Sequence, residues 1–468
     1  MRSVLRNISL LALGDVACKF LGLLAISYMA RVLGPEAFGQ INIGLAVLGY
    51  LTLTASPGIH LYGTRCVAAG KDETSEVVVP VTRLRLSLAA LLVIGVLSAV
   101  AIAGQGSAEE RVILLFSFSL VPLALSMEWY HQGKERMALI TGSRLILSGV
   151  YLLALLLLVR ERGDVVGVPI AFLIGNAAGS ALLLIAWIRS TGTARSILRG
   201  AGTRWRDLLR ASIPMGIGST LAQMVYHLPP ILIGLTLGPT AVGHFSAAMR
   251  VVIALLVADR AMSLVFFPIV VRAWNRDPGM LSSVSDRFLR MIVALALPAC
   301  LAVSAWAPQV ISTIYGPEFR HAESLLRVLI WFFFLTSLNT VFLFGLMGVG
   351  QEKRYARIMA LGTAAQVGLM LILASPLGLL GISIGFVGGE LLITILGFIE
   401  YGKVARIALS GTVYKPAIAG LAMALLLYFH PLGGRPAELI AAGAVYLGTL
   451  IAVGGISRDD LLVWVEES

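Results

Sequence analysis

Long apolar runs, separated by short polar or Gly/Pro-containing segments, follow one another along the whole chain. Each run is close to the roughly 20 residues that a helix needs to cross a membrane. Ser375, Pro376 and Gly378 leave open either a kink in one bent helix or a turn, and Pro with Gly favours the turn. The pattern predicts an all-α polytopic membrane protein with fourteen spans, at 8–30, 38–59, 86–103, 112–130, 138–159, 165–188, 213–237, 242–271, 288–306, 325–349, 355–374, 377–399, 413–429 and 439–456.

The first apolar run has features of a secretory signal, because Arg2 and Arg6 precede it. Asp15 and Lys19 interrupt the run, however, and no pattern of small residues suited to cleavage follows it. We therefore interpret this run as an uncleaved first membrane helix.

Composition narrows the class of protein further. Of 468 residues, 58% are apolar and 13% are charged, which leaves no room for a large soluble domain. The net charge of +11 would suggest nucleic-acid binding in a soluble protein. With a cytoplasmic N-terminus, however, 26 of the 36 lysines and arginines fall on the cytoplasmic side and 8 on the outer side. This bias predicts that both termini are cytoplasmic, and it attributes the charge to topology and anionic membrane lipids rather than to nucleic acid.

The longest connection, 189–210, is basic, and in its last part apolar residues such as Trp205 and Leu208 alternate with charges. This pattern is typical of an interfacial helix on the cytoplasmic face. The connection separates six spans from eight, so we predict four regions. They are an N-lobe at 1–188, the interfacial linker at 189–210, a C-lobe at 211–401, and two further spans with a cytoplasmic tail at 402–468.

An internal repeat supports two related halves. Leu33, Gly34, Pro35, Ala37 and Gly39 recur 204 residues later as Leu237, Gly238, Pro239, Ala241 and Gly243. A second repeat pairs 133–138 with 350–356, and six spans separate the members of each pair. Because six is even, the halves share one orientation, as in transporters built from parallel repeats. The alternative is that Leu-Gly-Pro is a common turn without further meaning.

Three segments carry a family resemblance. They are the stretch from Asn7 to Arg65, which contains the 30–39 motif followed by Asn42 and Tyr50, the segment 314–319, and the segment 350–354. With them the chain resembles the Wzx- or PST-type polysaccharide-biosynthesis flippases of the multidrug/oligosaccharidyl-lipid/polysaccharide exporter superfamily.

The resemblance implies a V-shaped pair of six-helix lobes in the bacterial cytoplasmic membrane. It also implies alternating-access export of an undecaprenyl-diphosphate-linked oligosaccharide, such as an O-antigen, capsule or exopolysaccharide unit, from the inner to the outer leaflet. Polysaccharide polymerase or assembly proteins are the implied protein partners. Lipid II flippases and cation-coupled multidrug exporters of the same superfamily remain alternatives, as does, more distantly, a membrane glycosyltransferase or polymerase.

A charged glycolipid needs a hydrated, cationic path, because a charge in the hydrocarbon layer costs at least about 2.5–3.5 kcal/mol. Asp15 and Lys19 lie four residues apart on one helical face. Lys19 is a candidate for binding the diphosphate, with Asp15 as an ion- or proton-sensitive coupling partner. The alternative is a mutually neutralised pair. The repeat aligns Lys19 with Gln223, which is therefore a second substrate-binding candidate.

Two arginines of the eighth predicted span are further substrate-binding candidates. Arg250 and Arg260 lie ten residues apart, which places them about 80° apart around a helix. A guanidinium offers a bidentate fork that suits a diphosphate. Alternatively, Arg260 pairs with a nearby carboxylate, or the span ends before it and Arg260 is cytoplasmic.

The remaining candidates are a carboxylate and a histidine. Glu390, near the middle of the twelfth span, suits ion or proton coupling, and a structural hydrogen bond to another helix is equally compatible. His227 precedes Pro229 and Pro230, where a broken helix would form a hinge, although a packed structural histidine is the alternative. Glu128, beside Trp129, Tyr130 and His131, is interpreted as an interfacial anchor, with a role in the substrate pathway as the alternative.

Motifs of catalysis and cofactor binding are missing from the chain. It contains no P-loop, no nucleophile elbow and no zinc motif, and Cys18, Cys66 and Cys300 have no metal-ligand spacing. We therefore expect no enzymatic activity and no cofactor. Coupling to an ion gradient or to the membrane potential is the hypothesis for the driving force.

Overall fold

A computed structural model describes residues 2–70, 77–104, 106–191, 205–276, 278–407, 413–429 and 436–455. Within these ranges the chain is helical, with no β-strand, which confirms the predicted all-α class. Most of the predicted linker lies outside the described residues.

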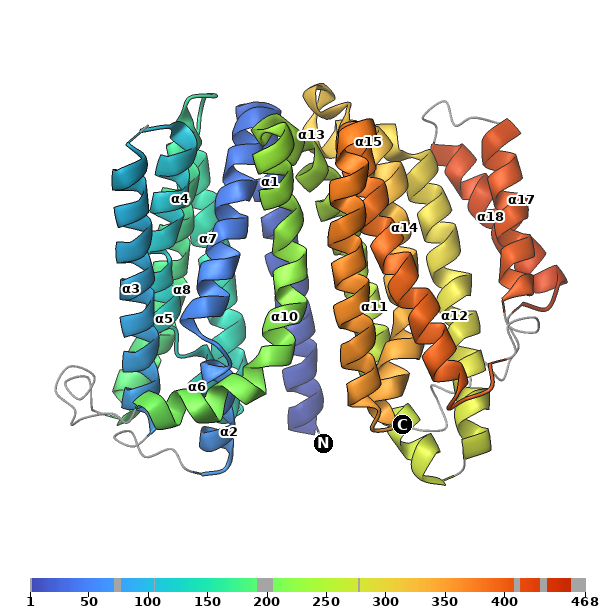
Figure 1. The fold of residues 1–468 in the computed structure, drawn as a ribbon, viewed down its shortest axis with the longest axis horizontal. Coiled ribbons are helices and arrows are strands. Elements are labelled where there is room, and N and C mark those ends of the chain that lie inside the picture. The colour runs from blue at the N-terminus through green and yellow to red at the C-terminus, as the bar shows by residue number, and fades with distance from the viewer. Residues whose placement is uncertain are drawn as a thin grey trace. The chain divides into compact units, whose positions relative to one another are not determined.

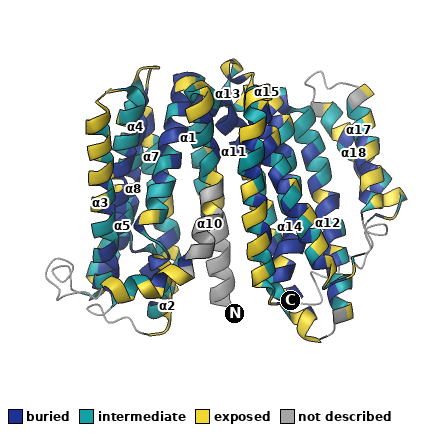
Figure 2. Ribbon diagram, viewed as in Figure 1, coloured by how far each residue is buried: buried dark blue, intermediate teal, exposed yellow. Residues whose placement is uncertain are grey.

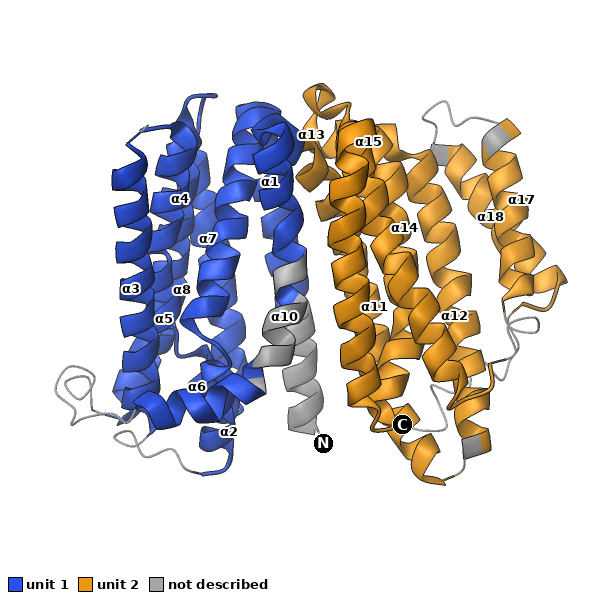
Figure 3. Ribbon diagram, viewed as in Figure 1, with its two compact units in different colours: residues 1–243 blue, residues 244–468 orange. Residues whose placement is uncertain are grey.

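The chain divides into two compact units, Met1–Gly243 and His244–Ser468, called unit 1 and unit 2 (Figure 3). Unit 1 is built from α1 (Arg2–Ala55), α2 (Ile59–Ala68), α3 (Val79–Ala103), α4 (Ala108–Phe118), α5 (Leu120–Leu125), α6 (Glu128–Gly133), α7 (Met137–Leu158), η2 (Asp164–Val166), α8 (Gly167–Thr191) and α10 (Trp205–Leu237) (Figure 1). Unit 2 holds most of α11 (Pro239–Arg276), with α12 (Pro278–Ala305), α13 (Ala307–Tyr315), η3 (Pro317–Phe319), α14 (Ala322–Gly348), α15 (Glu352–Gly402), α17 (Tyr414–Phe429) and α18 (Pro436–Ala452).

Nine helices in the described part of the chain are long and apolar enough to cross a membrane. Three shorter apolar helices accompany them, at Tyr226–Leu237, Tyr414–Leu427 and Ala437–Ala452. The chain is thus a multi-pass membrane protein, and the count of fourteen spans stays a prediction. The predicted lobe boundary at 211 also stays a prediction, whereas the compact unit 1 extends to Gly243 and includes α10.

Two of the long helices are each interrupted by a glycine with non-helical backbone angles. In α1 this residue is Gly34, with φ 77°, followed by Pro35. In α15 it is Gly378, with φ 56°, two residues after Pro376. Positive φ is accessible to glycine without the steric cost that a side chain brings. The predicted turn at 375–378 is therefore confirmed as a break in the helix.

The two copies of the Leu-Gly-Pro repeat contact each other within unit 1. A Cβ built on Gly39 would collide with the carbonyl of Pro239, and one built on Gly243 would collide with the carbonyl of Pro35. Small residues allow membrane helices to approach backbone to backbone in this way. The duplicated glycines therefore have a shared structural reason, since each of them packs against the proline of the other copy.

The first turns of α10 pack against the hydrophobic core of unit 1. Leu208 and Leu209 pack against a buried cluster that includes Ile59, Trp129 and Trp187. The basic start of α10 thus covers the end of unit 1 that is formed by α2 and α6. α10 then continues through Pro214 as a single helix to Leu237.

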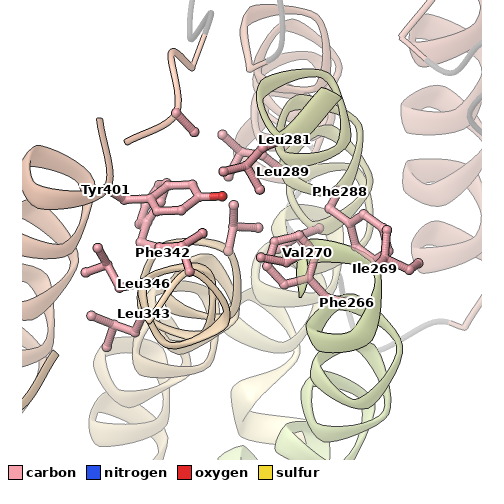
Figure 4. Packing of buried hydrophobic residues seen from close by; sticks show 14 of the residues in the cluster. Phe266, Ile269, Val270, Leu281, Phe288, Leu289, Phe342, Leu343, Leu346 and Tyr401 are labelled. Atoms are coloured by element: carbon pink, nitrogen blue, oxygen red, sulfur yellow. The ribbon is translucent and has the colours of Figure 1, made fainter. Parts of the chain in front are cut away.

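Unit 2 has its own aromatic core. Phe266 and Phe288, with ring centroids 4.8 Å apart, join α11 to α12, while Phe342 of α14 packs beside Tyr401 of α15 (Figure 4). The last two helices add a separate cluster, in which the Tyr446 hydroxyl donates to the Ala294 carbonyl at 2.9 Å.

Apolar side chains are also exposed along the helices, as the yellow positions on α3 illustrate (Figure 2). Leu91 and Ile94 of α3 are 65% and 59% exposed. In a chain of this composition, such faces meet lipid rather than water.

Candidate functional site

Unit 1 holds a cluster of three charges contributed by three helices. Arg144 of α7 donates from Nη2 to Glu128 Oε1 of α6 at 2.6 Å, and from Nη1 to Asp15 Oδ1 of α1 at 3.3 Å. The three side chains are 41–50% exposed. We call Asp15, Glu128 and Arg144 the unit 1 charge cluster.

Close packing brings the helices of this cluster together. Gly14 lies directly against the Thr141 side chain, so that α1 and α7 approach closely one residue before Asp15. Glu128 occupies the first turn of α6, just after the chain leaves α5 in an extended conformation at Ser126.

Arg85 of α3 holds the break between α5 and α6. Its Nη1 donates to the Ser126 carbonyl at 3.0 Å, and its Nη2 donates to the Leu123 carbonyl at 2.7 Å. These carbonyls lie at the end of α5, where regular helical donors run out, and the Leu123 carbonyl also accepts from the Ser126 backbone N–H at 3.3 Å. Arg85 therefore fixes the backbone from which Glu128 projects.

The exposure of the cluster indicates which medium it meets. Asp15 and Arg144 lie inside helices that are apolar enough to span a membrane. Half-exposed ion pairs contribute only about 0–1 kcal/mol to stability, whereas charges facing hydrocarbon cost several times more. The charge cluster must therefore face water or a polar ligand rather than lipid.

Lys19 lies one turn beyond Asp15 and is exposed. Among the described residues, the ionic partner of Asp15 is Arg144 rather than Lys19, so the mutually neutralised Asp15–Lys19 pair is wrong. Arg144 was not among the predicted site residues, because it was counted with Lys134 and Arg136 among the 26 cytoplasmic lysines and arginines. Its position seven residues inside the predicted span 138–159 was the available signal.

His227 and Gln223 of α10 also belong to unit 1. A Cβ built on Gly49 would lie 2.5–2.6 Å from three atoms of the His227 ring, so the imidazole rests directly on α1 at this glycine. The expected helix break at Pro229 and Pro230 is wrong, because α10 continues unbroken across both prolines. An interior proline removes a helical hydrogen bond and favours a kink or a break, and α10 nevertheless continues past both prolines.

Unit 2 contains a different polar cluster, which is buried and acidic. Glu390 of α15 accepts hydrogen bonds from Asn339 Nδ2 at 2.7 Å and from Thr336 Oγ1 at 3.1 Å. Asp259 of α11 accepts one from Thr340 Oγ1 at 2.7 Å. Residues 336–340 of α14 thus connect two carboxylates, and we call this set the unit 2 carboxylate cluster.

Glu390 is only 9% exposed and Asn339 is 5% exposed. The amide oxygen of Asn339 is buried without a hydrogen-bond partner. Glu390 thus has the structural hydrogen bonds to another helix that were one expectation, and an orphaned acceptor lies beside it. A buried acceptor without a donor is costly, and a bound cation or water would satisfy it.

The two arginines of α11 have different surroundings. Arg260 is exposed and makes no ion pair with any described residue, since the neighbouring Asp259 bonds to Thr340 instead. α11 continues to Arg276, so Arg260 lies well inside the helix. A neutralising carboxylate is therefore not found for Arg260 among the described residues, while the position at which the span ends stays a prediction. Arg250 is partly buried and acts electrostatically on Tyr315.

Among the described residues, no group of three or more His, Cys, Asp or Glu side chains is placed to hold a metal ion. The contacts of the two clusters are ion pairs in unit 1 and hydrogen bonds to buried carboxylates in unit 2.

Sequence comparisons identify relatives of the whole chain. The model of the family described as "Polysaccharide biosynthesis protein" matches residues 4–274. A protein of Escherichia coli (strain K12) named as an O-antigen transporter is 25% identical over 405 residues, covering 84% of this chain and 95% of its own. A protein of Haloferax volcanii named as a low-salt glycan biosynthesis flippase is 21% identical over 364 residues, covering 77% of this chain and 75% of its own.

Solved structures show the same fold. The lipid II flippase MurJ in an inward closed conformation matches with a TM-score of 0.76 at 12% identity, covering 97% of this chain and 99% of its own. A MATE family multidrug resistance transporter of the MOP superfamily, in an inward-facing conformation, matches with a TM-score of 0.67 at 18% identity. The match covers 82% of this chain and 94% of the transporter chain. These matches confirm the predicted superfamily fold.

Proposed function

Because this chain belongs to the polysaccharide biosynthesis protein family, we propose that it is a flippase that moves a lipid-linked oligosaccharide from one membrane leaflet to the other. The substrate is a polyprenyl diphosphate carrying an O-antigen, capsule or exopolysaccharide unit, exported from the inner to the outer leaflet by alternating access. The names of the bacterial and archaeal relatives support this assignment, and they are names of transporters rather than enzymes.

The observation that carries the proposal is the exposed guanidinium of Arg144 in the middle of apolar helices. A guanidinium binds a diphosphate through a bidentate pair of charge-assisted hydrogen bonds. In the substrate-free chain, Asp15 and Glu128 occupy this fork. The diphosphate displaces at least one of these carboxylates when it binds, and Lys19, one turn away, supplies a second cation.

The carboxylates of unit 2 are the proposed coupling site. Asp259 and Glu390 offer carboxylate oxygens to a proton or a small cation, and Asn339, which bonds to Glu390, adds its unpartnered amide oxygen. Asp15 is the proposed ion-sensitive group in unit 1. Arg250 and Arg260 are proposed to bind the anionic substrate at a different stage of its passage.

The cytoplasmic membrane is the proposed location, with both termini cytoplasmic and two six-helix lobes followed by two additional helices. The charge bias of the loops supports this orientation. A polysaccharide polymerase or assembly protein is the proposed recipient of the flipped glycolipid.

Reconstitution into liposomes with a fluorescent polyprenyl-diphosphate glycan tests the proposal, with accessibility of the label in the outer leaflet as the readout. We expect protein-dependent translocation that Arg144→Gln and Lys19→Ala reduce at least tenfold and that the exposed-site control Arg320→Gln leaves unchanged. Exchange of cationic drugs without translocation of any such lipid would instead favour the multidrug exporter, and transport restricted to lipid II would favour that flippase.

A further inference from the structure

A group of aromatic and polar side chains lies along α10 where it packs on the second half of α1. Gln223, Tyr226 and His227 are spaced i, i+3 and i+4, so they share one face of α10. Tyr50 of α1 lies beside them, with its ring centroid 6.0 Å from that of His227 and the planes tilted by 60°. We call Tyr50, Tyr226 and His227 the aromatic subsite.

The backbone of α1 fixes the orientation of the His227 ring. Three ring atoms lie so close to Gly49 that a side chain at this position would collide with them. The contact of Ile43 with Gly234, together with that of Gly49 with His227, shows that α1 and α10 run antiparallel here. One side of the imidazole thus packs on Gly49 of α1, and the Tyr50 ring lies against it at a tilt.

The rings are not enclosed as a packed core would be. Tyr226 is 46% exposed, Gln223 is exposed, and Tyr50 and His227 are partly exposed. No hydrogen bond joins the His227 ring nitrogens to any described residue. The nitrogens of the His227 ring, within an apolar helix, therefore require water or a polar ligand.

The aromatic subsite lies at the depth of the cationic residues. Lys19 and Gly49 are each fifteen residues from the break at Gly34, which corresponds to about 22 Å of helix on either side of it. Asp15, in the charge cluster, lies about one turn further from the break. The aromatic subsite and the cationic residues therefore lie on the two arms of α1, at similar distances along the helix from this break.

We propose that the aromatic subsite binds a sugar ring of the substrate. The apolar C–H face of a pyranose stacks on Tyr50, Tyr226 or His227, while the Gln223 amide and the ring hydroxyl and nitrogen groups bond to its hydroxyls. This inference rests on the proposed function and adds a division of labour, in which unit 1 cations bind the diphosphate and the aromatic subsite distinguishes glycosylated from bare carrier.

The test measures the dissociation constants of two probes on the full-length protein in nanodiscs. The probes are a polyprenyl diphosphate and the same lipid carrying a disaccharide, quantified by native mass spectrometry. The wild-type chain should bind the glycosylated lipid more tightly than the bare lipid. Since one aromatic contact contributes a factor of about 2–12, His227→Leu and Tyr50→Leu should each reduce this preference by about that factor.

Control variants separate the subsite from folding and from the anion site. Binding of the bare lipid should be unchanged in both leucine variants, and Tyr50→Phe should retain the preference because it keeps the ring. Tyr414→Leu, which alters an equally exposed tyrosine of unit 2, should change neither constant. Arg144→Gln should weaken both probes together.

Each outcome decides between the two proposals. An unchanged preference in His227→Leu and Tyr50→Leu, or equal affinity of the wild-type chain for both probes, overturns the aromatic subsite and leaves the flippase assignment intact. A wild-type chain that binds neither probe overturns the flippase assignment and the subsite with it.

Discussion

Replacing Glu128 by Gln should strengthen binding of a polyprenyl diphosphate, because it removes a competitor for Arg144. In the substrate-free chain, Glu128 Oε1 lies 2.6 Å from Arg144 Nη2, with the two side chains 41% and 47% exposed. An ion pair with this exposure contributes up to about 1 kcal/mol, so its removal should tighten binding up to about fivefold.

The sign of this effect separates two roles for Glu128. If the carboxylate only supports the fold, the variant should lose stability and bind no better. If it occupies the anion site, the dissociation constant should fall while the midpoint of thermal unfolding in detergent changes little. Release of the lipid should become slower, so turnover at saturating substrate should also fall.

The assay is titration of the bare polyprenyl diphosphate at low and high salt, followed by translocation in liposomes. The matched control is Glu161→Gln, which removes one exposed carboxylate of unit 1 outside the charge cluster. The gain in Glu128→Gln should shrink at high salt because screening weakens the ion pair. Equal or weaker binding in Glu128→Gln at low salt, relative to Glu161→Gln, refutes competition by the carboxylate.

Three further variants test the parts around the sites. Arg85→Met should lower the free energy of unfolding by about 1–3 kcal/mol, since it removes the side-chain donor of the Ser126 carbonyl and one of the two donors of the Leu123 carbonyl, and denaturation in detergent would show the loss. Gly39→Ala should cost about 1–3 kcal/mol through its collision with the Pro239 carbonyl, whereas Gly95→Ala, which meets open space, should leave the thermal midpoint unchanged or higher. Glu390→Gln should retain binding of the lipid and abolish the acceleration of transport by an imposed ion gradient. Full acceleration in this variant would remove Glu390 from the coupling site.

Hydrophobic length predicted the fold class well because a membrane helix must satisfy its own backbone and hide it from lipid. The break at Gly378 was predicted for the same kind of reason, since Pro and Gly act locally. The pair of prolines at 229 and 230 shows the limit of that reasoning. The surrounding helix α10 continues through both, because packing against α1 holds it where the local signal favours a break.

The candidate sites were predicted only in part, because the sequence does not show which residue of another helix pairs with each candidate. The sequence placed Asp15 next to Lys19 by helical spacing, yet Asp15 pairs with Arg144 of a helix more than a hundred residues later. Helical spacing identifies residues that share a face, but it cannot identify the helix that packs against that face. Asn339 and Thr336, the partners of Glu390, gave no charge signal and were missed for the same reason.

The two polar clusters differ in burial, and this difference assigns them different chemistry. Charges that are about half exposed, as in the unit 1 charge cluster, can exchange one partner for another at small cost, which suits a large anionic substrate that must bind and leave. Glu390 is almost fully buried and bonded to neutral donors, and a buried carboxylate of this kind suits a proton or a small cation better than a large anionic ligand. A protein that binds substrate in one unit and the coupling ion in the other can link them only through a change of conformation. Neutralising Glu390 should therefore alter the gradient dependence of transport, and any change in lipid affinity at Arg144 would measure the coupling free energy between the two sites.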